Sequence, residues 1–243
     1  MISKNQIKRI VSLQQKKFRK ELQLFVAEGH KVINEFINEG WEVEQIFTTD
    51  AALFHQKNLN IELISEAELN KISALTTPND CLAVVKIPEP INTKKSGWTV
   101  VLDDIKDPGN AGTIIRLCDW FGIETMVCSP ETVDVFNPKV VQASMGSLAR
   151  VSVVYQALEV FLEAQNKPVY GTFMNGTAVY ETTFETEGIL VLGNEANGIS
   201  TKIEQKIEQK IAIPRFGRLQ KTESLNVATA TAIFLSEIRR KTL

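Results

Sequence analysis

The sequence predicts an α/β protein built on a parallel sheet, and three observations lead to this prediction. From Trp98 onward, apolar strand candidates alternate with helical segments, which is the order typical of a parallel sheet covered by helices on both faces. Apolar residues make up 44% of the 243 residues and charged residues 23%, which is ordinary for a globular protein. The chain has no run of about 18 apolar residues, so we expect no membrane span.

Six short apolar segments are the strand candidates of this sheet. They are TVVLDDI (99–105), ETMVCS (124–129), VSVVY (151–155), PVYGTFM (168–174), GILVLGN (188–194) and KIAIP (210–214). Helical patterns separate several of them, as in 137–148, where Asn137 suits a cap and Pro138 a first turn. The last segment, 224–241, predicts a long helix with Ala230, Phe234 and Ile238 along one side.

The first 90 residues predict a separate, small α/β domain. Val32, Ile33 and Phe36 share one helical face, and Ser65 with Glu68 forms a capping-box pattern. The stretch PEPINTKKSG (88–97) contains two prolines, charges and a glycine, as linkers do. We therefore expect a domain at 1–90, a linker at 91–97 and a second domain at 98–243.

Charge and cysteine usage limit the class of protein. The net charge of −2 argues weakly against a nucleic-acid partner, yet residues 1–20 carry seven Lys and Arg and no acid. Such a segment attracts phosphates, or it is simply the solvated face of a helix.

Cys81, Cys118 and Cys128 form no C-x-x-C pair, and the two histidines lie far from Cys118 and Cys128, so we expect free thiols and no metal site. The N-terminus has no apolar signal core, which favours the cytoplasm.

Three segments place unusual residues where strands are predicted to end, the edge at which open parallel sheets bind ligands. The first, DPGNAGTIIR (107–116), is neither G-x-G-x-x-G nor a P-loop, so on its own it indicates nucleotide binding only weakly. Arg116 lies beside Ile115 and Leu117, and we expect it to be buried. A buried guanidinium is costly unless a carboxylate or a phosphate meets it. A plain turn with a salt-bridged arginine is the structural alternative.

The second and third segments have similar structural alternatives. In LVLGNEANGIS (190–200), Gly193 allows a close approach to the backbone and Glu195 suits a ligand hydroxyl or ammonium, or the stretch is a tight turn. In the third segment, Pro214 ends a strand, and Ser224 and Asn226 stand where the last helix begins, a usual place for a serine N-cap. The loop between them also carries three cations, listed here: Arg215, Arg218, Lys221.

Together these motifs resemble the SpoU (TrmH-type) RNA ribose methyltransferases of the SPOUT class. The matching residues are Asn110, Gly112 and Arg116; Gly193, Glu195 and Gly198; and Ile213, Pro214, Ser224, Leu225 and Asn226. They occur in the family's order within residues 99–243. Residues 1–90 also look like the substrate-binding domain of many members that act on ribosomal RNA.

The resemblance implies a parallel sheet with a C-terminal deep trefoil knot, a bound S-adenosylmethionine and a homodimer with its site near the subunit interface. Gly193, Ile213 and Leu225 match the family's cofactor contacts. The implied catalytic set is Asn110, Arg116, Glu195, Ser224 and Asn226. Arg116 would act as a base or would bind the phosphate and orient the ribose 2′-hydroxyl, and we favour the second role because arginine normally stays protonated. No metal is implied.

The implied partner is RNA, with ribosomal RNA favoured over transfer RNA because of the first domain. The candidate RNA contacts are Lys16, Lys17 and Arg19 in that domain, and Arg215, Arg218 and Lys221 in the other. The nine residues between Pro214 and Ser224 exceed the loop of many members, either to contact RNA or as a tolerated insertion. The alternatives are an RNA-binding module without catalysis, a nicotinamide-dependent dehydrogenase, which the absent G-x-G-x-x-G disfavours, and a base methyltransferase.

Overall fold

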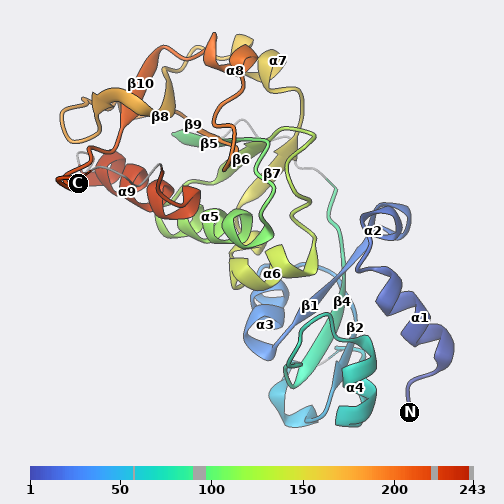
Figure 1. The fold of residues 1–243 in the computed structure, drawn as a ribbon. Coiled ribbons are helices and arrows are strands. Elements are labelled where there is room, and N and C mark those ends of the chain that lie inside the picture. The colour runs from blue at the N-terminus through green and yellow to red at the C-terminus, as the bar shows by residue number, and fades with distance from the viewer. Residues whose placement is uncertain (57, 90–96, 220–223, 241–243) are drawn as a thin grey trace. The chain divides into compact units, whose positions relative to one another are not determined.

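The computed structural model describes residues 1–56, 58–89, 97–219 and 224–240 (Figure 1). The chain divides into two compact units. The first unit contains Met1–Pro90 together with Asp134–Ala149, and the second contains Ile91–Val133 and Arg150–Leu243. Each unit has its own sheet.

The sheet of the first unit has four strands in the order β1-β4-β2-β3. They are β1 (Leu24–Glu28), β2 (Val43–Thr48), β3 (Ile61–Leu63) and β4 (Cys81–Lys86). β4 is antiparallel to both β1 and β2, while β2 and β3 are parallel. Every residue of β1 is buried, so both faces of this strand lie inside the unit.

Short helices cover both faces of this sheet. They are α1 (Lys4–Ser12), α2 (Lys16–Leu22), α3 (His30–Asn38), α4 (Glu66–Ile72), α6 (Pro138–Ser144) and the 3-10 turns Ala51–Leu53 and Ser147–Ala149. Ile10 and Leu13 pack with Leu24 and Val26 in one apolar cluster. The predicted capping box at α4 is present, because Ser65 and Glu68 each bond the other's backbone N–H.

The segment Asp134–Ala149 belongs to the first unit, although the sequence pattern had placed it in the second domain. Phe136 packs its ring against Phe25 at 5.0 Å between centroids. The indole Nε1 of Trp41 donates a hydrogen bond to the carbonyl of Ala149 at 3.2 Å. Side chains from β1 and from the segment after α3 (Phe25 and Trp41) thus hold a stretch more than 90 residues downstream.

Arg19, predicted to contact RNA, is instead buried, and this part of the prediction is wrong. Its side chain is only 2% exposed, and its Nη2 lies 2.6 Å from Oδ2 of Asp134. Its other donors reach the carbonyls of Leu13 and Gln14 at 2.8 and 2.9 Å. All these partners lie within the first unit, so Arg19 ties two distant parts of that unit together.

The sheet of the second unit has six strands, all parallel, in the order β10-β8-β9-β5-β6-β7. They are β5 (Trp98–Asp103), β6 (Thr125–Cys128), β7 (Ser152–Tyr155), β8 (Val169–Ala178), β9 (Gly188–Gly193) and β10 (Gln209–Ala212). Each begins within a few residues of its predicted position. The predicted α/β class with a parallel sheet is therefore confirmed.

Helices lie along this sheet (Figure 1). They are α5 (Pro108–Trp120), α7 (Leu158–Glu163), α8 (Thr201–Glu204) and α9 (Val227–Arg240). α9 packs beside α5, and Arg239 donates to the carbonyls of Phe121 and Gly122 just after α5. Within the described part of the chain, no helix has the length and apolar character needed to cross a bilayer.

Candidate active site at the carboxyl ends of β5 and β9

The order of strands reverses between β5 and β9. The chain runs from β5 outward through β6 to β7 and then returns on the other side through β8, β9 and β10. β5 and β9 are direct parallel neighbours, with Asp103 opposite Gly193 at their ends. The loops after two such strands diverge, which opens a crevice where α/β sheets bind ligands. Two of the three predicted segments begin here.

The first segment forms the start of α5. Asp107 is the N-cap of this helix, and its Oδ1 accepts a hydrogen bond from the backbone N–H of Asn110 at 2.7 Å. Pro108 occupies the first turn, where its missing N–H costs nothing. This local geometry fixes Asn110 in the first turn of α5, close to the end of β5.

A chain of side-chain hydrogen bonds joins all three predicted segments. The Nδ2 of Asn226 donates to Oδ1 of Asn110 at 2.8 Å. The Nδ2 of Asn110 donates in turn to Oε1 of Glu195 at 3.0 Å. Asn226 and Glu195 lie on either side of Asn110 although 116 and 85 residues separate them from it. The predicted convergence of the three segments is thus present for these residues.

Asn226, and not Ser224, caps the last helix. The Oδ1 of Asn226 accepts from the backbone N–H groups of Ala228 and Thr229 at 3.0 and 3.1 Å, as an N-cap side chain does. The Nδ2 of Asn226 is left for Asn110. Ser224 lies two residues before the cap and lines the cavity described below.

The loop after β9 is a tight turn whose backbone leaves no room for a side chain at Gly193. Asn194 and Gly198 exchange two backbone hydrogen bonds of 3.0 and 2.9 Å. A Cβ on Gly193 would lie 2.2 Å from the carbonyl carbon of Gly198 and 2.2 Å from the nitrogen of Ile199. Gly198 itself has φ of +68°, in the left-handed region that favours glycine. Both predicted glycines therefore have a structural reason, and the turn presents Glu195.

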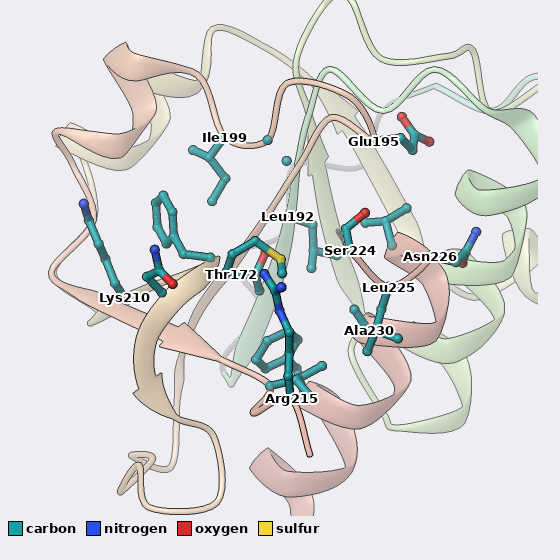
Figure 2. A pocket seen from close by; sticks show the side chains of 18 of the residues that line it. Thr172, Leu192, Glu195, Ile199, Lys210, Arg215, Ser224, Leu225, Asn226 and Ala230 are labelled. Atoms are coloured by element: carbon teal, nitrogen blue, oxygen red, sulfur yellow. The ribbon is translucent and has the colours of Figure 1, made fainter. Parts of the chain in front are cut away.

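A cavity of about 1610 Å³ opens beside this turn (Figure 2). Its walls come from the ends of β8 and β9, the turn after β9, the segment after β10 and the start of α9. Apolar side chains, including Leu192, Ile199 and Phe234, line part of it. In Figure 2, Glu195 and Asn226 lie toward one end, Lys210 lies at the other, and Arg215 extends toward Thr172.

Most of the predicted site residues of the second unit line this cavity. They are Gly193, Glu195, Ile213, Arg215, Arg218, Ser224, Leu225 and Asn226. Asn110 does not line it but hydrogen-bonds Glu195 and Asn226, which do. Lys221 lies outside the described residues. Lys16 and Lys17 belong to the first unit, where both are exposed at the start of α2.

Arg116 differs from the expectation, because it is exposed and not buried. It does not line the cavity of its own chain. It lies six residues beyond Asn110 in α5, which is about 9 Å along a helix axis. Ile115 is buried and Leu117 is half-buried, but consecutive helical residues are turned by about 100° and do not share a face. Trp120, one turn further along α5, is 83% exposed.

Sequence reasoning missed three residues that hold the site. The Nδ2 of Asn194 donates to the carbonyl of Asp104 at 2.7 Å, which links the turn after β9 to the end of β5. Asp104 has φ of 62°, a strained conformation for a residue other than glycine. The buried carboxylate of Asp103 accepts from the backbone N–H of Ser200 at 2.7 Å. The Asp–Asp pair at a strand end was visible in the sequence, but its partners were not.

Comparison with known proteins now adds to this geometry. The model of the SpoU rRNA Methylase family matches residues 97–236, more than half of the chain. The chain belongs to this family. The predicted resemblance to SpoU methyltransferases is thereby confirmed. The model of the MRM3-like substrate binding domain matches residues 4–83 of this SpoU-family chain.

Individual relatives of this SpoU-family chain match over nearly its full length. The 23S rRNA (guanosine(2553)-2′-O)-methyltransferase RlmP of Bacillus subtilis is 30% identical, covering 98% of this chain and 97% of its own. A TrmH-family structure from Porphyromonas gingivalis is 39% identical with a TM-score of 0.88 and 99% of both chains covered. An AdoMet-bound rRNA methyltransferase from Sinorhizobium meliloti is 28% identical with a TM-score of 0.87, covering 100% of this chain and 98% of its own.

Proposed function

We propose that this protein transfers a methyl group from S-adenosylmethionine to a ribose 2′-hydroxyl of ribosomal RNA. The observation that carries the proposal is the hydrogen-bonded chain from Asn226 through Asn110 to Glu195 at the edge of a large cavity. These are the family's motif residues, and they come from three segments far apart along the chain. Full-length similarity to a named 23S rRNA 2′-O-methyltransferase supports the reaction and the substrate class.

The cavity is more than large enough for S-adenosylmethionine, and its chemistry suits that cofactor. Pockets for ligands of this size occupy about 300–1,000 Å³ and combine apolar walls with a few polar groups. Here Leu192, Ile213 and Leu225 offer apolar contacts, and the turn at Gly193 offers backbone close to the cavity. We propose that Gly193, Ile213 and Leu225 hold the cofactor. The AdoMet-bound relative supports the identity of the cofactor.

The residues at the edge of the cavity would position the acceptor. When bound, S-adenosylmethionine would supply the methyl group to the ribose oxygen and would become S-adenosylhomocysteine, while the hydroxyl proton would pass to water. Asn110 is fixed by two side-chain hydrogen bonds, and its rigid amide is suited to orienting the ribose. Glu195 holds that amide, Asn226 braces it, and Ser224 shapes the pocket. Arg116 binds the phosphate and stabilises developing charge.

The first test is methyl transfer from labelled S-adenosylmethionine to total RNA. We expect Asn110→Ala and Arg116→Ala each to lower the rate about 100- to 1000-fold, the cost of removing one oriented donor. Asn70→Ala removes a comparable surface amide on α4, in the first unit, and should leave the rate unchanged. Calorimetry should show that both active-site variants still bind S-adenosylmethionine. Full activity of Asn110→Ala and Arg116→Ala would refute the assignment.

We propose that the active protein is a homodimer. Arg116 does not line the cavity of its own chain, yet it shares the exposed side of α5 with Trp120. A tryptophan left 83% exposed is typical of an interface residue. In such a dimer Arg116 would act at a site completed by the second copy.

The dimer predicts a specific effect at Trp120. Trp120→Asp should produce monomers in sedimentation velocity and lower methyl transfer about 100-fold or more, because a charge buried at an interface is costly. Val160, also exposed at 65% but on α7, provides a matched control, and Val160→Asp should leave the mass unchanged. If Trp120→Asp sediments like the unchanged protein, α5 is not the interface.

We also propose that the C-terminal part of the second unit forms the deep trefoil knot of the SPOUT class. Family membership supports this, since knots are too rare to be expected otherwise. The proximity of Asn226 to both Asn110 and Glu195 fits a chain end that returns to the sheet between earlier loops. An experimental structure with an unknotted backbone would refute it.

The RNA target is proposed to be ribosomal, with the protein in the cytoplasm. The match of residues 4–83 to a substrate-binding domain and the RlmP relative support ribosomal over transfer RNA. Mapping 2′-O-methyl sites in RNA from cells with and without the gene tests this choice. If nuclease digestion of the methylated RNA yields a methylated base, the protein is a base methyltransferase. If calorimetry with S-adenosylmethionine shows no heat of binding, the protein is a non-catalytic RNA-binding module.

A further inference from the structure

The loop Arg215–Leu219 exposes two large apolar side chains at the cavity. Phe216 is 83% exposed and Leu219 is 74% exposed, and both line the cavity wall. Leaving a phenylalanine in water forgoes the favourable burial that such side chains normally obtain. The ring therefore lies ready for a partner that the isolated chain does not supply.

Two arginines lie close to this ring in the sequence. Arg215 precedes Phe216 directly, and Arg218 follows two residues later, also exposed. The carboxylates that line the same cavity already have partners: Glu204 lies 2.5 Å from Lys210, and Glu195 accepts the amide of Asn110. The loop thus carries an exposed aromatic ring with an arginine on each side of it in the sequence, and the two carboxylates that line the same cavity already have hydrogen-bond or ion-pair partners.

The cavity is larger than one cofactor requires. Its volume of about 1610 Å³ exceeds the range of about 300–1,000 Å³ that is common for a single small ligand. If S-adenosylmethionine occupies the part near Gly193, Ile213 and Leu225, space remains beside the Arg215–Leu219 loop. A second ligand can therefore lie against Phe216 while the cofactor is bound.

We propose that Phe216 is a stacking platform for a base of the RNA strand beside the target nucleotide, with Arg218 at the adjoining phosphate. This inference rests on the proposed function, because it requires the target ribose at the same cavity. Proteins recognise unpaired RNA by stacking its bases on aromatic side chains while cations meet the backbone. An aromatic ring between arginines has this chemistry, whereas a protein partner would more often meet a continuous apolar patch.

Graded substitutions at position 216 test the platform. We expect Phe216→Ala and Phe216→Leu to lower kcat/KM for RNA about 5- to 100-fold, the range for losing one stacked base, mainly through KM. Phe216→Trp keeps an aromatic face and should stay within a few-fold of the original. Tyr180 is an exposed aromatic side chain of the same unit that does not line the cavity, so Tyr180→Ala should change nothing.

Three outcomes would overturn the inference. Equal activity of the Ala, Leu and Trp variants would show that the ring is not used. A weaker affinity of Phe216→Ala for S-adenosylmethionine in calorimetry would make the loop part of the cofactor site. Dissociation of a dimer by Phe216→Ala in sedimentation velocity would make it a contact between copies.

A cross-linking experiment separates this inference from the proposed function. Ribosomal RNA transcribed with 4-thiouridine is irradiated with the full-length protein, and the joined peptide is identified by mass spectrometry. We expect a cross-link at Phe216, and we expect it to persist in Asn110→Ala, in which RNA binding should remain although methyl transfer is much slower. A cross-link without methyl transfer by the unchanged protein would count against the proposed function alone. Methyl transfer without a cross-link in the 215–219 loop would overturn the platform.

Discussion

Gly193→Ala is expected to weaken S-adenosylmethionine binding about 10- to 100-fold, the usual range for forcing a methyl group into filled space. The added Cβ would lie 2.2 Å from the backbone of both Gly198 and Ile199, and backbone atoms cannot rotate away as a flexible side chain can. The turn after β9 must therefore move. Because Glu195 is part of that turn and holds Asn110, methyl transfer should fall further than cofactor affinity does.

The matched control is Gly217→Ala in the same cavity. A Cβ on Gly217 would have no atom within 4 Å, so cofactor affinity should be unchanged. Isothermal calorimetry with S-adenosylmethionine measures both variants, and circular dichroism checks that each is folded. If Gly193→Ala binds S-adenosylmethionine as tightly as the unchanged protein, the turn after β9 can accommodate a side chain and does not require glycine at this position.

The second large effect concerns the stability of the first unit. Arg19→Ala should lower the free energy of unfolding by about 3–5 kcal/mol, because it leaves the carboxylate of Asp134 without its buried partner. The same change removes the donors to the carbonyls of Leu13 and Gln14. Lys16→Ala, three residues earlier and exposed, should cost less than about 0.5 kcal/mol.

Differential scanning calorimetry measures the loss of stability in Arg19→Ala and in Lys16→Ala. The two units are fitted with separate transitions, because a chain with two units need not unfold in one step. RNA affinity provides the contrasting result. If Arg19 acts only inside the fold, Lys16→Ala should weaken RNA binding more than Arg19→Lys does under conditions where both are folded. An Arg19→Ala variant as stable as the original would contradict the buried ion pair.

The sequence contained enough local information to predict the elements of the parallel sheet but not their order. Each strand from β5 to β10 has an apolar run, and such runs depend only on neighbouring residues. The position of β9 between β8 and β5 depends on contacts between distant segments, for which a single sequence has no local signal. The resemblance to a family, and not periodicity, indicated that the three motifs would meet.

Two arginines were assigned to the wrong environment for the same physical reason. Arg19 follows several lysines and looked like part of a charged surface, while Arg116 adjoins isoleucine and leucine and looked buried. Within a helix, however, the environment is set by residues three and four positions away and by whatever packs on that face. The partner of Arg19, Asp134, is 115 residues distant, which no local pattern reveals.

Because Asp134–Ala149 belongs to the first unit, that unit cannot be produced as a simple N-terminal fragment. The polypeptide passes between the units three times, so cleavage within 91–97 would leave 134–149 attached to the second unit and joined to 1–90 only by noncovalent contacts. A fragment ending at residue 90 would lack Phe136 and Asp134, and would display Phe25 and an unneutralised Arg19 to solvent. Deletion studies of RNA binding therefore need a grafted copy of 134–149, and aggregation of the shorter fragment should not be taken as evidence against an RNA-binding role.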